Sequence, residues 1–196
     1  QDWVEIFKKN QRLLWLIALA TTPALLVGLL LENQAETIFR SPLIIVLNLI
    51  IFGLILGWAD SVGKKEGRLN QLNWLKAFLI GLSQALALVP GVSRSGITIS
   101  LGLFLGLKRD SAARFSFLLL TPILLAASLW RSFDLFDQGV VIIGGSWLSA
   151  LIGLLTSFIF SYLALIFLFK IVKKSSYWPF VFYRIILALI VLSISI

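Results

Sequence analysis

Three features of the sequence predict an all-α integral membrane protein: its hydrophobicity, its scarcity of charge and the length of its apolar runs. Of the 196 residues, 59% are hydrophobic and 13% are charged, and the mean hydropathy is +0.99. A soluble domain keeps roughly a quarter of its residues charged. Apolar runs of about 18 residues or more, long enough to cross a ~30 Å hydrocarbon core as helices, recur along the chain. These features exclude a soluble enzyme and a disordered chain.

Five apolar segments are predicted to cross the membrane within one membrane domain, residues 1–196. They cover residues 13–31, 42–59, 111–130, 146–169 and 178–196. Thr-Pro pairs inside the first and third of these segments are tolerated as kinks in membrane helices. The segments are joined by short loops that hold most of the charged residues, so the sequence predicts five transmembrane helices.

The charges in the loops predict the orientation. Lys and Arg outnumber Asp and Glu by 17 to 9. The stretches with net positive charge are residues 1–12, 60–76, 108–114 and 170–174, whereas loops 32–40 and 131–137 are net negative. The positive-inside rule places the basic stretches in the cytoplasm. Since the basic residues belong to these loops, no nucleic-acid partner is expected.

Residues 74–107 are predicted to enter the membrane and return to the same side. This segment is interrupted by a polar stretch, residues 90–96 (Pro-Gly-Val-Ser-Arg-Ser-Gly), here called the tip. Its second limb, residues 97–107, measures about 16 Å as a helix, which is about half a bilayer. The orientation of the flanking loops also requires a return to the cytoplasm. The prediction is a re-entrant helix–loop–helix with its tip near the midplane.

The order of the elements suggests an inverted repeat. Three spans follow the re-entrant pair and two precede it, and inverted duplications in membrane proteins often meet at broken helices. Residues 13–59 would then be the remainder of a first repeat, and residues 74–196 the second. One further span and one further re-entrant pair are expected before Gln1, which is not a natural start residue. The chain is therefore expected to be a processed product or a fragment.

The composition of the tip indicates an anion site. Arg94 is the charge that this topology places deep in the membrane, where it needs a partner or a watery cavity. Ser95 is expected to cap the outgoing helix, and the amides of residues 95–98 would then point toward a bound anion. Arg94 adds a bidentate fork for phosphate oxygens. Hydroxyls of Ser93, Ser95 and Thr98 would donate hydrogen bonds, and one of the two serines is a candidate nucleophile.

A purely structural role for Arg94 is the alternative, either snorkelling or pairing with a carboxylate. It is disfavoured because the nearest acidic residues, Glu66 and Asp110, lie in loops. Gln84 is expected either to contact a ligand or to hydrogen-bond between helices, and both interpretations stay open. Arg114 and Arg184 are expected to snorkel to the basic interface. The chain has no Cys and no His, which excludes disulfides and His-based catalysis within it.

The tip and its surroundings resemble a known enzyme family. Residues 84–98 (QALALVPGVSRSGIT), residues 106–117 (GLKRDSAARFSF) and the Pro-Phe-x-x-Tyr-Arg start of the last helix resemble the bacterial undecaprenyl-diphosphate phosphatases of the bacitracin-resistance type. The resemblance covers nearly the whole chain. It implies hydrolysis of undecaprenyl diphosphate to undecaprenyl phosphate and inorganic phosphate, which recycles the lipid carrier of peptidoglycan synthesis and confers bacitracin resistance. It also implies two inverted halves in the bacterial plasma (inner) membrane, with the site open to the outer face.

The resemblance assigns roles to residues at the tip. Arg94, Ser93 and Ser95 are the implied catalytic residues. The diphosphate would be bound by a larger set, namely Gln84, Gly91, Ser93, Arg94, Ser95, Gly96 and Thr98. The implied ligand is a polyprenyl diphosphate lipid. The oligomeric state stays open, and a homodimer is one of the states considered.

The chain departs from the family pattern in one respect. In the family's Glu/Gln-x-x-x-Glu motif, Gln84 matches the first position, but Leu88 occupies the last, so this copy supplies no carboxylate. By the resemblance, the acidic pair, the His and a second serine-rich loop belong to the N-terminal copy. A divalent cation, Mg²⁺ or Ca²⁺, would be bound mainly there. This chain is therefore expected to hold half of the site and to be inactive alone. The alternative function is a transporter or flippase of a polyprenyl phosphate lipid.

Overall fold

The computed structural model describes residues 3, 6, 8, 10–37, 41–137 and 147–195. Within them the fold is all-α, as predicted, and no strand forms. The helices are α2 (Gln11–Thr37), α3 (Pro42–Val62), α4 (Trp74–Gln84), α5 (Arg94–Phe104), α6 (Arg109–Asp137), α7 (Trp147–Lys174) and α8 (Trp178–Ser195), with short 3₁₀ turns η2 (Leu69–Gln71) and η3 (Ala85–Leu88).

Five of these helices, α2, α3, α6, α7 and α8, are long and apolar enough to cross a membrane. They coincide with the five predicted spans, so the chain is a multi-pass membrane protein. Two predicted loops begin later than expected, because residues 32–37 continue α2 and residues 131–137 continue α6. Residues 38–40 and the acidic side chains of both loops lie outside the described part of the chain. None of the apolar window of α7 is buried, so lipid-facing apolar surface is extensive.

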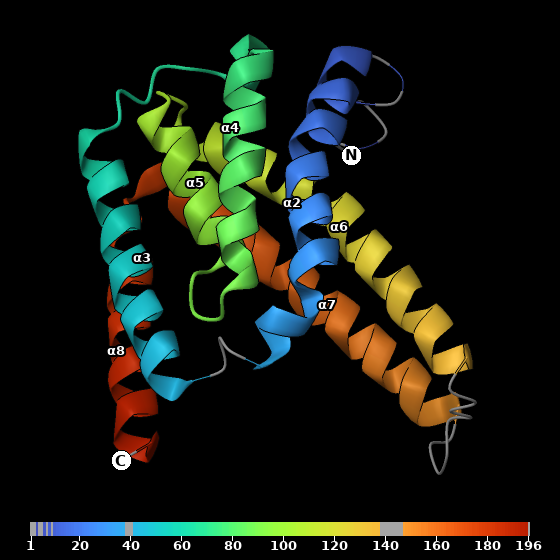
Figure 1. The fold of residues 1–196 in the computed structure, drawn as a ribbon. Coiled ribbons are helices and arrows are strands. Elements are labelled where there is room, and N and C mark those ends of the chain that lie inside the picture. Colours follow the sequence, from blue (N-terminus) through green and yellow to red (C-terminus); the bar gives the residue numbers. More distant parts are fainter. Residues whose placement is uncertain are drawn as a thin grey trace.

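The helices pack as neighbouring pairs around the re-entrant segment (Figure 1). Helix α3 lies along α8, and α2 lies along α4, while α5 sits between α3 and α6. Helices α6 and α7 lean away from the rest of the bundle. Close contact between α2 and α4 depends on Gly81, since a Cβ there would overlap the backbone of Ala20. Small residues commonly permit such close approach between membrane helices.

The helix–loop–helix predicted for residues 74–107 is present. Figure 1 shows α4 and α5 side by side, joined by a loop that lies beside α3. Their far ends are tied together, because the Lys76 ammonium donates to the Leu105 carbonyl at 2.9 Å. The loop before α4 joins the same place, where the Gly67 amide donates to the Gly106 carbonyl at 2.8 Å. Both limbs therefore start and end at one base. The division into two repeats stays a prediction.

A buried carboxylate joins three helices near this base. Asp60 is 1% exposed and accepts hydrogen bonds from Arg109 at 2.5 and 2.9 Å. It also accepts the Tyr177 amide at 2.9 Å, and the Tyr177 hydroxyl donates to the Arg109 carbonyl at 3.1 Å. Burial, and then the Asp60 charge, raise the pKa of the Tyr177 phenol, so it remains a donor. The end of α3 is thus fixed to the starts of α6 and α8.

Candidate functional site

The tip has an unusual backbone that brings it against α3. Gly91 has φ of +89°, and a Cβ at that position would lie 2.6 Å from the carbonyl oxygen of Ile45. Both the dihedral angle and the close approach require glycine. Ser93 also has a positive φ, +70°. The tip is therefore held in a conformation that few residue types can adopt.

The N-cap of α5 is Ser93, so the expectation of a Ser95 cap was wrong. The Ser93 side chain accepts the amide of Gly96 at 3.2 Å, and its carbonyl accepts the amide of Ile97 at 3.0 Å. The helix consequently starts at Arg94, two residues earlier than a Ser95 cap would place it. The amides left at its N-terminus are those of Arg94 and Ser95, not the four of residues 95–98. They carry the positive end of the helix dipole.

Two predicted site residues, Arg94 and Gln84, line one cavity of about 480 Å³. The rest of its wall is mainly apolar and comes from Leu88 and from α2 and α6, including Gly28 and Ile123. Gln84 is 2% exposed, yet neither its amide oxygen nor its amide nitrogen has a hydrogen-bond partner among the described residues. The interhelical hydrogen bond considered for Gln84 is therefore absent from the described part of the chain. Gln84 and Arg94 therefore border the same space.

The remaining predicted residues occupy different surroundings. Thr98 is buried between α5 and α6, donates to the Arg94 carbonyl at 2.9 Å and shares a hydrogen bond of 2.7 Å with Ser116. Ser95 is half-buried, and its hydroxyl bonds to none of the described residues. Gly96 is buried, with Ser93 on one side and Arg184 on the other. A role in substrate binding stays a prediction for all three.

Arg184 does not snorkel, and this expectation was wrong. It is 7% exposed, and its guanidinium donates to carbonyl oxygens of α3 and of the tip. Asn48, which the sequence did not single out, donates from its side-chain amide to the Pro90 carbonyl at 3.0 Å. One signal was available, since each is an isolated polar residue inside an otherwise apolar span.

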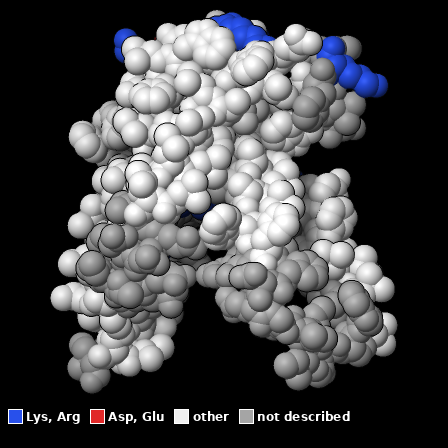
Figure 2. All heavy atoms as spheres, turned by 45° about the vertical axis from the view of Figure 1, so that its right-hand side comes forward, with Lys and Arg blue, Asp and Glu red and all other residues white. Residues whose placement is uncertain are grey.

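Positive charge gathers at one end of the molecule. Figure 2 shows Lys and Arg side chains at that end and one further basic group at the bottom of a hollow part-way along the face. Arg12 belongs to the basic end, where it donates to the Leu72 carbonyl at 2.9 Å. Arg94 and Arg184 lie deeper, at the tip. The site thus combines positive charge with an apolar wall.

No carboxylate cluster accompanies the tip in the described residues. They contain no group of three or more His, Cys, Asp and Glu side chains that could hold a metal ion. Asp60, the buried carboxylate, is bound to Arg109 and Tyr177 near the base of the pair.

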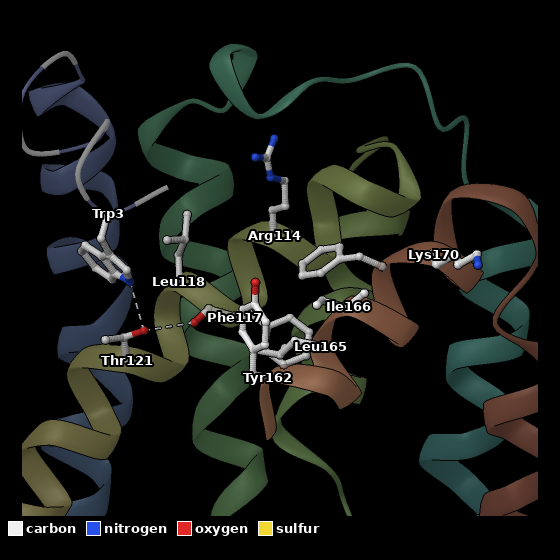
Figure 3. Close-up of a pocket in the computed structure, with 10 residues that line it drawn as sticks. Trp3, Arg114, Phe117, Leu118, Thr121, Tyr162, Leu165, Ile166 and Lys170 are labelled. Carbon is white, nitrogen blue, oxygen red and sulfur yellow. Dashed lines mark hydrogen bonds between the residues drawn. The ribbon is translucent and has the colours of Figure 1, made fainter. Parts of the chain in front are cut away.

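A second cavity, of about 890 Å³, lies between α6, α7 and Trp3 (Figure 3). Arg114 and Lys170 are on its rim, and Trp3 donates to the Thr121 hydroxyl at 3.3 Å. Arg114 is exposed, as expected for a snorkelling residue. No residue predicted for the site lines this cavity, so it is separate from the tip.

Comparison with known proteins identifies the family. The model of the bacitracin resistance protein BacA matches residues 1–190. Proteins named undecaprenyl-diphosphatase are similar to the chain: that of Moorella thermoacetica is 44% identical over 95% of this chain and 69% of its own length. Those of Trichlorobacter lovleyi and Pelobacter propionicus are 47% and 48% identical over 90% of this chain, and 65% and 64% of their own lengths. The chain thus spans about two thirds of the length of these relatives, and it belongs to the BacA family of bacitracin resistance proteins.

Proposed function

We propose that this chain forms the diphosphate-binding part of an enzyme that hydrolyses undecaprenyl diphosphate to undecaprenyl phosphate and inorganic phosphate. One observation carries the proposal: Arg94 and the unpartnered Gln84 line the same apolar cavity at the N-terminus of α5. A phosphate needs a cation and hydrogen-bond donors, and a prenyl chain needs an apolar wall. The names of the relatives support the same substrate.

The groups around the cavity would each make a different contact with the lipid diphosphate. The guanidinium of Arg94 would hold phosphate oxygens by a bidentate contact. The amides of Arg94 and Ser95, at the positive end of α5, would add donors that favour an anion. The Gln84 amide would supply the hydrogen bond that it lacks among the described residues. The prenyl chain would leave along the apolar side chains of α2 and α6.

Two serines are the proposed reactive groups. Ser93 accepts the Gly96 amide, so its oxygen is committed to holding the start of α5. Ser95 has no such commitment, and in the proposed enzyme it would contact the transferred phosphoryl group. In the hydrolysis, the bond between the terminal phosphorus and the bridging oxygen breaks. Undecaprenyl phosphate departs with that oxygen, and water supplies the oxygen of the released phosphate. Arg94 would stabilise the charge that develops.

A divalent cation, Mg²⁺ or Ca²⁺, remains part of the proposal for the enzyme as a whole. Such an ion would neutralise charge on the diphosphate. The described residues supply no ligand cluster for it. A dependence of phosphate release on added Mg²⁺ or Ca²⁺ tests this part of the proposal.

The proposed setting is the bacterial plasma membrane, with the cavity open to the outer face. Support comes from the basic residues, which gather at the end opposite to the direction in which the tip extends. Under the positive-inside rule that end is cytoplasmic. A homodimer is also part of the proposal, and crosslinking in native membranes tests it. The enzyme's role would be to recycle the lipid carrier of cell-wall synthesis.

Phosphate release from undecaprenyl diphosphate in detergent with Mg²⁺ is the test. The chain is assayed alone and joined to the part of the Moorella relative that it does not match. We expect release from the joined form and a loss on the order of 100-fold or more in Arg94→Ala. Lys170→Ala, at the second cavity, is the matched control and should retain activity. A folded joined protein that releases no phosphate but moves a polyprenyl phosphate across vesicles would establish the flippase alternative instead.

A further inference from the structure

We propose that Arg184 is a positioning residue for the tip: it fixes the backbone of Gly91 and Val92 against α3 and thereby sets the place of Arg94. This inference rests on the proposed function, since it concerns the same diphosphate site. It assigns to α8 a part in the site that the tip motif does not contain.

The contacts of Arg184 connect two segments that are distant in sequence. Its Nε donates to the Leu49 carbonyl at 3.2 Å, and its Nη2 lies 3.2 Å from the Asn48 carbonyl. The same Nη2 donates to the carbonyls of Gly91 at 2.7 Å and Val92 at 3.2 Å. A planar guanidinium can serve several acceptors in a fixed geometry, which an ammonium group cannot do. Arg184 therefore fixes the tip relative to α3.

The chemistry of the acceptors explains why an arginine is needed. The carbonyls of Gly91 and Val92 belong to a non-helical stretch, and buried carbonyls without a donor are costly. Those of Asn48 and Leu49 are in a helix, but each carbonyl oxygen has a second lone pair. Among the described residues Arg184 has no acidic partner, so carbonyl dipoles stabilise its charge. The positive charge thus stays close to the proposed anion site.

Arg184 approaches the tip from the side opposite to the cavity. Its contacts lie on α3 and on the backbone of the tip, whereas the cavity beside Gln84 and Arg94 is walled mainly by α2 and α6. A Cβ at Gly53 would lie 3.5 Å from the Arg184 side chain, so α3 packs closely on its stem. These positions indicate that Arg184 acts through the tip and is not a ligand of the substrate.

Asn48 provides a second and weaker anchor of the same kind. Its side-chain amide donates to the Pro90 carbonyl, one residue before Gly91. Loss of this single hydrogen bond should loosen the tip less than loss of the Arg184 contacts. Substitution of Arg184 should therefore make the tip more mobile than substitution of Asn48 does.

The mobility of a spin label attached to the tip measures how firmly the tip is held. The chain has no cysteine, so Ser95→Cys gives a unique attachment site. We expect the label to become more mobile in Arg184→Gln, less so in Asn48→Ala, and to regain part of its order in Arg184→Lys, which donates without the planar fork. Arg12→Gln is the matched control, since Arg12 also donates to a backbone carbonyl, that of Leu72, but is remote from the tip.

Activity is measured separately in the joined protein with Ser95 restored. Arg184→Gln should lower kcat on the order of 100-fold, because displacement of a catalytic group by about 1 Å has an effect of that size. The inference would be overturned if the joined protein without the Arg184 substitution is active but the label is no more mobile in a folded Arg184→Gln variant. The proposed function would then still stand. If the joined protein is inactive but the label becomes more mobile in Arg184→Gln, only the proposed function is overturned. If Arg184→Gln does not fold, Asn48→Ala is measured in its place. A label whose mobility is unchanged in Asn48→Ala then overturns the inference.

Discussion

The guanidinium of Arg184 donates a hydrogen bond of 2.7 Å to the carbonyl of Gly91, 93 residues earlier in the chain. Gly91 is also the residue whose Cα faces the Ile45 carbonyl of α3. One peptide of the tip therefore meets both α3 and α8. Substitutions there test how much of the site depends on that contact.

Gly91→Ala should destabilise the protein by about 2–5 kcal/mol. A left-handed backbone costs a non-glycine residue about 1–2 kcal/mol, and overpacking against α3 adds about 1–3 kcal/mol. Gly106→Ala is the control, since Gly106 has a similar φ of +88° but open space around it. Unfolding in detergent followed by circular dichroism should show the larger loss for Gly91→Ala. Equal losses would mean that the contact with Ile45 contributes nothing.

Gln84→Leu should stabilise the protein without ligand and weaken its binding of a diphosphate. The buried amide has no partner among the described residues, and an unsatisfied buried polar group costs about 1–3 kcal/mol. Leucine has nearly the same shape and removes that cost. Thermal unfolding and titration with inorganic pyrophosphate measure the two effects. A lower unfolding temperature in Gln84→Leu would show that the amide has a structural role.

Ser93→Ala should cost about 1 kcal/mol of stability through loss of the N-cap of α5. Ser93→Asn should restore stability, because asparagine caps well and tolerates a positive φ. Ser95→Ala, which removes no hydrogen bond to a described residue, should leave stability unchanged. Unfolding temperatures compare the three variants. A loss in Ser95→Ala equal to that in Ser93→Ala would assign capping to both serines.

Asp60→Asn should destabilise the protein on the order of 2–3 kcal/mol, since it weakens charge-assisted hydrogen bonds from Arg109 and the Tyr177 amide. Glu66→Gln, an exposed substitution in the neighbouring loop, should change stability by less than about 0.5 kcal/mol. Denaturant unfolding distinguishes the two variants. If both behave alike, the junction of α3, α6 and α8 does not depend on the carboxylate.

The helices could be predicted because membrane burial leaves a strong pattern. A span needs a long apolar run, and the shortness of residues 97–107, together with the charges of the flanking loops, predicted a return to the same side. The ends of α2 and α6 were less predictable: residues 32–37 and 131–137 carry charge and still continue a helix. Charge marks where a helix leaves the bilayer, not where its hydrogen bonding stops.

The site was predictable where its residues are adjacent in sequence. Arg94 and Gln84 were found from one short segment, and they do line one cavity. The role of Arg184 was mispredicted and Asn48 was missed, because both side chains bind backbone carbonyl groups, which every residue has and no motif records. The cap was placed at Ser95 because sequence alone does not reveal the positive φ of Ser93.

The re-entrant pair resembles a cantilever, a beam that is fixed at one end only. Hydrogen bonds from Lys76 to Leu105 and from Gly67 to Gly106 hold its base, and the tip is its free end. In a cantilever, a small rotation at the support becomes a large displacement at the end. With a lever arm of about 16 Å for the 11 residues of α5, a rotation of about 4° moves the end by about 1 Å. Residues at the base, remote from the tip, can therefore set how accurately the tip is positioned.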